Sequence, residues 1–146
     1  MIDVENQIIT NIIEAFTGTK YKDIYISSDP ARTPNTFPCV YIAQTDSYET
    51  RNTRPASREQ LFETVVFECY VYSNKTSGAK TECKNVMTII DESMRIQGFT
   101  RSTETPLMPS VDTVKAIRFS RYTANASTVK YTDSDTNKQR NMIYST

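Results

Sequence analysis

The sequence predicts an α+β fold, in which an antiparallel or mixed β-sheet of about four to five strands carries two helices on one face and extends into a long hairpin arm. Two observations lead to this prediction. Two segments repeat apolar residues with a helical period, and the segments around them are rich in β-branched and aromatic residues. Proline and polar turn residues separate these segments. The expected order is helix, strand, loop, strand, arm, strand, helix, strand and strand.

Residues 3–16 predict the first helix because their apolar residues recur at helical spacing. Asp3 is expected to cap the start of the helix, and Gly18 suits its end. Two interpretations of the apolar face stay open: it covers the sheet, or part of it also meets a neighbouring subunit. The face consists of Val4, Ile8, Ile12 and Ala15, widened by Ile9, Ile13 and Phe16.

Residues 23–27 and 39–45 predict two strands. The loop between them contains Pro30, Pro34 and Pro38, each of which biases the preceding residue to extended geometry and stiffens the loop. The second strand is apolar on both faces, as an inner strand covered on two sides would be.

Residues 46–60 are the most polar internal segment, and they contain Arg51, Arg54 and Arg58. The flanking strands would form a long antiparallel hairpin with this segment at its tip. A loop of this length is either solvated or orders against a partner subunit. Arginine forks suit carboxylates of a protein partner or phosphates of a nucleic acid, and the nearby Glu49 and Glu59 weaken the phosphate interpretation.

The central part of the chain is a strand followed by a helix. Residues 61–72 are dense in β-branched and aromatic residues and contain no glycine or proline, which favours a buried strand. A helix is expected to start at Ala79, capped by Ser77 or Thr76, and to end at Gly98 in a left-handed C-cap. Its apolar stripe consists of Ala79, Cys83, Val86, Met87, Ile90 and Met94.

The last third of the chain predicts a brief extended piece at residues 99–101, and then a loop broken by Pro106 and Pro109. A strand follows at 111–124, a turn at Ala124–Ser127 and a short strand at 128–131.

Residues 1–131 are expected to form one domain, and residues 132–146 a polar C-terminal extension. Chain ends are usually poorly ordered unless they are tied down. A small apolar patch near the end of the extension makes it a candidate for docking. This patch consists of Met142, Ile143 and Tyr144.

Composition argues against several function classes. The 17 basic and 17 acidic residues give zero net charge, which disfavours a general nucleic-acid binder or a polybasic membrane anchor. The sequence contains no histidine, which removes the commonest general base and most zinc sites. We therefore predict no catalytic, cofactor-binding or metal-ligating residues. The widely spaced Cys39, Cys69 and Cys83 suit buried thiols in a reducing compartment.

The segment at residues 70–101, YVYSNKTSGAKTECKNVMTIIDESMRIQGFTR, resembles a family of tailed-phage tail-terminator or tail-completion proteins, also labelled minor capsid proteins. The family pattern is a strand ending in VYSN, then K-xx-G-xK-xEC, a helix with D-E-xM, and GF. Upstream, Phe37-Pro38 followed by Val40 and Ile42 is also similar, so the resemblance runs from about residue 2 to Tyr131. The pattern residues are Val71 to Asn74, Lys75, Gly78, Lys80, Glu82, Cys83, Asp91, Glu92, Met94, Gly98 and Phe99.

The resemblance implies a structural virion protein without enzymatic activity or cofactor, assembled in the host cytoplasm. It would form a homo-oligomeric ring, typically a hexamer, that ends tube polymerisation at the head-proximal end of the tail and joins tail to head. The implied partners are itself, the tail tube protein and head-closure or connector proteins, with phage DNA only transiently in the lumen and no membrane. The hypothesised contact residues are Arg51, Arg54, Arg58, Met142, Ile143 and Tyr144.

Three alternatives remain. The chain could be another neck component, such as a head-closure or connector subunit, or a tail tube protein. A small nuclease or hydrolase would need a carboxylate cluster or a nucleophile pair, which the sequence does not show. A nucleic-acid-binding module would need a stronger positive charge and would reveal itself by steeply salt-dependent DNA binding.

Overall fold

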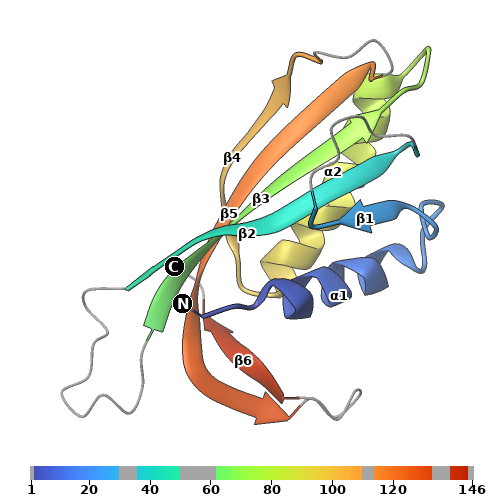
Figure 1. Cartoon of the computed structure of the whole chain (residues 1–146). Coiled ribbons are helices and arrows are strands. Elements are labelled where there is room, and N and C mark those ends of the chain that lie inside the picture. Colours follow the sequence, from blue (N-terminus) through green and yellow to red (C-terminus); the bar gives the residue numbers. More distant parts are fainter. Residues whose placement is uncertain (1, 30–35, 50–61, 110–113, 133–138, 145–146) are drawn as a thin grey trace.

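A computed structural model of the chain describes residues 2–29, 36–49, 62–109, 114–132 and 139–144. It confirms the α+β fold, with a mixed sheet and two helices (Figure 1). No helix in these ranges is both long and apolar enough to cross a membrane. The elements in order are α1 (Glu5–Phe16), β1 (Tyr25–Ser27), β2 (Cys39–Glu49), β3 (Phe62–Ser73), α2 (Ala79–Ile96), β4 (Thr100–Leu107), β5 (Ala116–Thr132) and β6 (Gln139–Tyr144).

The sheet has six strands, five of them in the order β1-β2-β3-β5-β4, with β6 added alongside β5. β1 runs parallel to β2, and all other pairs are antiparallel. The long strand β5 pairs with β4 through residues 117–123 and with β6 further along the chain, so it joins the upper and lower parts of the sheet in Figure 1.

The expected hairpin of β2 and β3 is confirmed. β2 extends further than predicted, to Glu49, whereas β3 lies within one residue of the predicted bounds. They stay paired out to Glu49 and Glu63, with a register shift between Gln44 and Asp46. The tip that follows, residues 50–61, lies outside the described residues.

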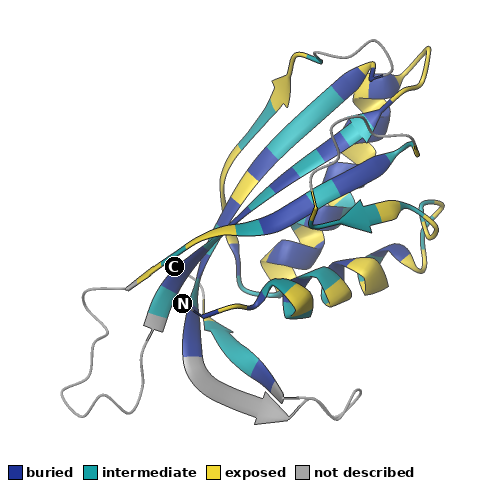
Figure 2. Ribbon diagram, viewed as in Figure 1, coloured by how far each residue is buried: buried dark blue, intermediate teal, exposed yellow. Residues whose placement is uncertain are grey.

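Both helices pack on one face of the sheet, and the main core lies between these layers (Figure 2). Alternate β3 residues point into this core, where Val65, Phe67, Cys69 and Val71 are fully buried. The ring of Phe67 meets Phe99 edge to face at 5.3 Å. The whole predicted stripe of α2 is buried there, as are Val4, Ile8, Ile12 and Phe16 around α1. Each fully buried side chain of this size stabilises the fold by about 1.5–3 kcal/mol.

The predicted C-cap of α2 is confirmed. Gly98 has a φ of 97°. The N–H of Phe99 donates to Met94 O, and the N–H of Gly98 donates to Arg95 O. These two bonds form the Schellman motif that satisfies the last carbonyls of a helix.

The predicted side-chain N-caps are wrong. The N-cap of α2 is Gly78, with a φ of 79°, and no side chain caps it, so Ser77 and Thr76 do not have that role. α1 begins after Val4, also without a side-chain cap. Asp3 lies one residue too early, and its carboxylate accepts a hydrogen bond from Glu5 N instead.

Two predictions for the C-terminal third are also wrong. The expected turn at Ala124–Ser127 lies inside β5, where Ala124 and Ala126 are buried and hydrogen-bonded in register with β3. The side chains of Ala124 and Ala126 are small enough to pack in the hydrophobic core, to which both residues belong. The expected loop after residue 101 is strand up to Leu107, because Pro106 is tolerated at the edge of a sheet.

Candidate interaction surfaces

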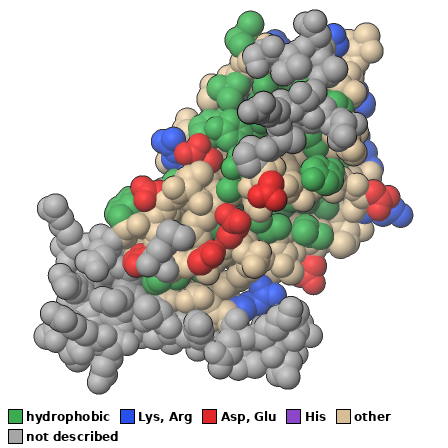
Figure 3. Space-filling model, in the orientation of Figure 1, with side chains coloured by type: hydrophobic (Ala, Val, Ile, Leu, Met, Phe, Trp, Pro, Cys, Tyr) green, Lys and Arg blue, Asp and Glu red, His purple; other side chains and the backbone are tan. Residues whose placement is uncertain are grey.

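The face of the sheet opposite the helices carries a surface made of strand side chains. On β3, Val66, Glu68, Tyr70 and Tyr72 alternate with the buried core residues and therefore point to this open face. Each of these four is only partly buried. Figure 3 shows hydrophobic side chains gathered over the upper part of the sheet on the side that it views.

Two rows of paired residues cross five strands on this face. The first row runs Tyr25, Cys39, Tyr72, Ile117 and Leu107, and the second runs Ser27, Tyr41, Tyr70, Phe119 and Thr105. Apolar and aromatic residues dominate both rows. We call the following set the aromatic patch: Tyr25, Tyr41, Tyr70, Tyr72, Leu107, Ile117 and Phe119.

The rings at the centre of the aromatic patch contact one another. The centroid of Tyr70 lies 5.0 Å from Phe119, 5.8 Å from Tyr41 and 6.4 Å from Tyr72. Aromatic pairs at these distances stabilise their arrangement by about 0.5–1.5 kcal/mol beyond the burial of area. The patch is therefore a pre-organised apolar surface, exposed most at Tyr25, which is 54% accessible.

An ion pair borders the aromatic patch. Arg121 lies 3.4 Å from the carboxylate of Glu68, and its guanidinium is 5.8 Å from the ring centroid of Phe119. Burial, and then the negative charge of Glu68, raise the pKa of Tyr70. The phenol of Tyr70 therefore keeps its proton and remains a hydrogen-bond donor. An apolar centre with phenol hydroxyls and a charged border is the composition that protein interfaces favour.

The sequence predicts a strand covered on both sides at residues 39–45, and in the part of the chain that the structure describes the helices cover one side. The sequence does indicate the aromatic patch, because apolar residues occur on both faces of β2 and of β3. The same pattern also fits strands that are buried on both faces within one chain. The predicted contact residues therefore do not include Tyr41, Tyr70 and Phe119.

The predicted contact residues fall into two groups. Arg51, Arg54 and Arg58 lie outside the described residues. Met142, Ile143 and Tyr144 lie on β6, which docks on its own chain. Ile143 packs against the core, and a Cβ on Gly98 would lie 3.4 Å from its Cγ2. Met142 is half-buried, and Tyr144 is 40% exposed.

Polar side chains of α1 hold β6 in place. Gln7 Nε2 donates to the carbonyl of Asn141 at 3.1 Å, and Asn141 N donates to Gln7 Oε1 at 3.0 Å, so the amide side chain pairs like a strand backbone. Arg140 Nη1 donates to Asn11 Oδ1 at 3.2 Å. The extension that begins at residue 132 thus contains a strand bound to both the sheet and α1.

Four of the residues that carry the family resemblance, Ser73, Lys75, Glu82 and Cys83, lie at the joint between β3, α2 and β5. Ser73 Oγ donates to Glu82 Oε1 at 2.7 Å, and Lys75 Nζ lies 3.2 Å from Glu82 Oε2. The thiol of Cys83 donates to the carbonyls of Val71 and Ala116, both at 3.6 Å. The buried carboxylate of Glu82 is thus paired with Lys75. It lies in the first turn of α2, at the positive end of the helix dipole.

The three cysteines are buried and free. Burial raises the pKa of Cys39 and of Cys83 to about 11, and it raises the pKa of Cys69 as well. Thiols with raised pKa values are poor nucleophiles. Within the part of the chain that the structure describes, no group of three or more His, Cys, Asp or Glu side chains could hold a metal ion.

No family model matches this sequence, and no curated protein matches it either. The resemblance to tail-terminator proteins rests on the sequence pattern.

Proposed function

We propose that this chain is a structural subunit of a phage virion, a tail terminator that closes into a ring at the head-proximal end of the tail tube. The observation that carries the proposal is the aromatic patch, on the sheet face opposite the two described helices. An apolar surface of several aromatic and aliphatic residues in two rows favours burial against another subunit. The family resemblance supplies the identity of the assembly.

A ring needs two different surfaces on each subunit, because each copy contacts its two neighbours through non-identical patches. The fold offers several surfaces of this kind. The aromatic patch lies on one face of the sheet and the helices on the other, and the outer edges of the sheet are β1 and β4. Edge strands can pair with a strand of a neighbouring chain.

Two measurements test the proposal: the mass of the assembly in solution, with and without tail tube protein, and negative-stain imaging of the same samples. A single-layer ring that caps the end of tubes is the expected result. Long tubes formed by this protein alone would instead assign it to the tail tube. Binding only to head-closure or connector proteins would assign it to another neck position, and a monomer in every mixture would overturn the proposal.

A variant links this outcome to the aromatic patch. Tyr70→Ser removes the ring that contacts three neighbouring aromatics, so we expect the dissociation constant of the ring to rise by about 30-fold, as for a central interface residue. Tyr48→Ser is the matched control, because Tyr48 is a tyrosine of β2, 52% exposed, that lies outside the patch. An equal effect of both changes would show that the patch has no special role.

A further inference from the structure

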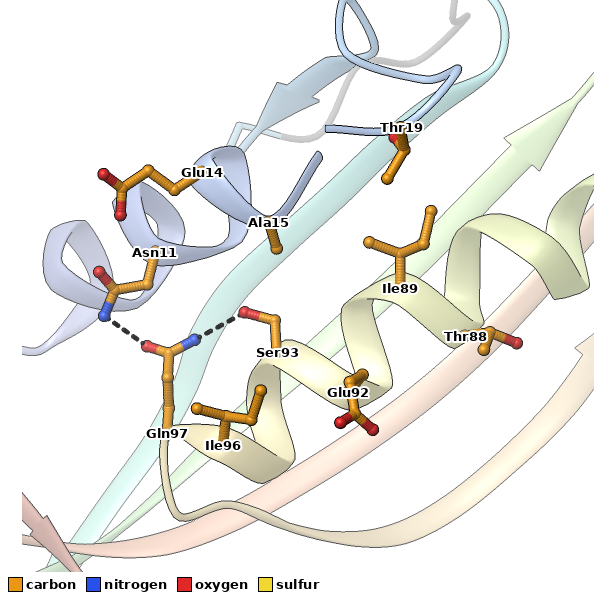
Figure 4. Close-up of a pocket in the computed structure, with 10 residues that line it drawn as sticks. All are labelled: Asn11, Glu14, Ala15, Thr19, Thr88, Ile89, Glu92, Ser93, Ile96 and Gln97. Carbon is orange, nitrogen blue, oxygen red and sulfur yellow. Dashed lines mark hydrogen bonds between the residues drawn. The ribbon is translucent and has the colours of Figure 1, made fainter. Parts of the chain in front are cut away.

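A groove of about 550 Å³ runs between the two helices, on the side of the molecule away from the aromatic patch. In Figure 4, Ile89 and Ile96 of α2 lie across from Ala15 of α1, and Thr19 stands at one end. Asn11 Nδ2 donates to Gln97 Oε1 at 2.9 Å and bridges the helices at the other end. Ile96 is 74% exposed and also lines the adjoining hollow beside β6.

The opposite end of the molecule carries an apolar side chain that is almost fully exposed. Met108 follows β4 directly and is 91% exposed. Pro106 and Pro109 flank it and restrict the backbone on both sides, so this short segment loses little conformational entropy when it binds. Methionine is unbranched and polarisable, and it adapts to irregular apolar hollows.

Charge distinguishes these two regions. Among the described residues that line the groove, the charged ones are Glu14 and Glu92, and Arg95 neutralises Glu92 through an ion pair at 2.5 Å. The hollow beside Pro106, near Met108, is lined by Lys80, Lys84 and Arg118. Arg118 is paired with Glu104 at 3.0 Å, so the two lysines supply the positive charge there. Complementary charge of this kind orients two surfaces before they touch.

We propose that the groove between α1 and α2 receives the Met108 segment of a neighbouring copy of this chain. β4 ends at the top of the molecule in Figure 1, whereas α1 lies at its lower right, so one chain cannot fill its own groove. The contact is head-to-tail, with Met108 against Ile89 and Ile96, and with the lysines facing Glu14. The inference rests on the proposed ring and identifies one of the surfaces that subunits use to join.

Cross-linking between copies tests the contact. The variants Met108→Cys and Ile96→Cys place accessible thiols on the two surfaces, and the three native cysteines are buried and unreactive. The two purified variants are mixed and treated with a short bismaleimide. We expect cross-linked dimers that contain one chain of each variant, and a ladder of larger products when both changes are in the same chain.

Ile13→Cys is the matched control for the groove position, because Ile13 is an aliphatic residue of α1, 47% exposed, that does not line the groove. Mixed with Met108→Cys, it should give little product. Product of equal yield with Ile13→Cys, or cross-linking of Met108→Cys with itself alone, would overturn the head-to-tail contact.

Solution mass separates failure of this inference from failure of the proposed ring. Met108→Ser should raise the dissociation constant of the assembly by at least about tenfold, and Glu14→Lys should raise it more at low salt than at high salt. Rings that form normally in both variants would overturn the groove contact and leave the ring intact. A wild-type protein that stays monomeric at every concentration, with and without tail tube protein, would overturn both.

Discussion

The two faces of strand β3 use apolar residues in different ways. On the helix side, Phe67, Cys69 and Val71 are fully buried and have no strongly polar atom. On the open side, Tyr70 and Tyr72 are only partly buried and end in hydroxyls. Full burial suits side chains without a polar group, whereas tyrosine tolerates water at its tip and still offers an apolar ring to a partner. The difference teaches that one face stabilises the fold and that the other is suited to assembly.

The largest expected effect comes from truncating one aromatic residue on each face. Phe67→Ala should lower the free energy of unfolding by about 3–5 kcal/mol, because it leaves a cavity in the core beneath α2. Tyr70→Ala should lower it by about 1 kcal/mol, because the ring is already in contact with water. Urea unfolding of the two variants measures both values. Equal losses would mean that the open face also belongs to the core.

The next largest effect is expected at Gly98, which follows α2 and lies beside Ile143 of β6. Gly98→Ala should lower the free energy of unfolding by about 1–2 kcal/mol, because its φ of 97° disfavours a side chain and the new Cβ would lie 3.4 Å from Ile143. Gly18→Ala is the control, since nothing lies within 4 Å of a Cβ at that position. Thermal unfolding of both variants compares them, and similar midpoints would show that the C-cap conformation is not required.

The smallest effect is a change of the free energy of unfolding with pH that arises from Glu63, at the start of β3. Burial raises the pKa of this carboxyl, but hydrogen bonds from Ser47 and from Ile2 N lower it, and the net pKa lies below its usual 4.5. The folded state therefore binds its proton less readily than the unfolded chain. The resulting stability is present above about pH 4.5 and is lost as the pH falls through the folded-state pKa.

The variant Glu63→Gln checks this assignment. It keeps the shape of the side chain and removes its titration, so the loss of stability between neutral and acidic pH should become shallower than in the wild type. Unfolding by urea at a series of pH values measures the slope. Parallel curves for the two proteins would assign the acid sensitivity to other carboxyls.

Sequence patterns located most of the fold because they report local geometry. The period of 3.6 placed α2, from Ala79 to Ile96, almost residue by residue, and the absence of breakers placed β3. Patterns failed where neighbours decide the outcome. The alanines of β5 have weak strand propensity, yet pairing with β3 holds them in one continuous strand. Pro106 breaks helices but not an edge strand.

The predicted contact residues depended even more on the tertiary structure. An apolar cluster at the end of a chain indicates docking but does not name the surface, and Ile143 docks on the core of its own chain. The aromatic patch could not be told from a second buried face, because alternation shows that both faces are apolar and not which of them the helices cover.

The sequence by itself determined the two amphipathic helices, the central strand β3, the long hairpin and the left-handed conformation at Gly98. These depend on side-chain periodicity and on backbone sterics, which act within a few residues. Only the tertiary structure decided that the extension returns as β6, that residues 124–127 continue β5, and that Tyr41, Tyr70 and Phe119 lie together on the face opposite the helices. Those outcomes depend on pairing between residues far apart in the chain, which no local pattern encodes.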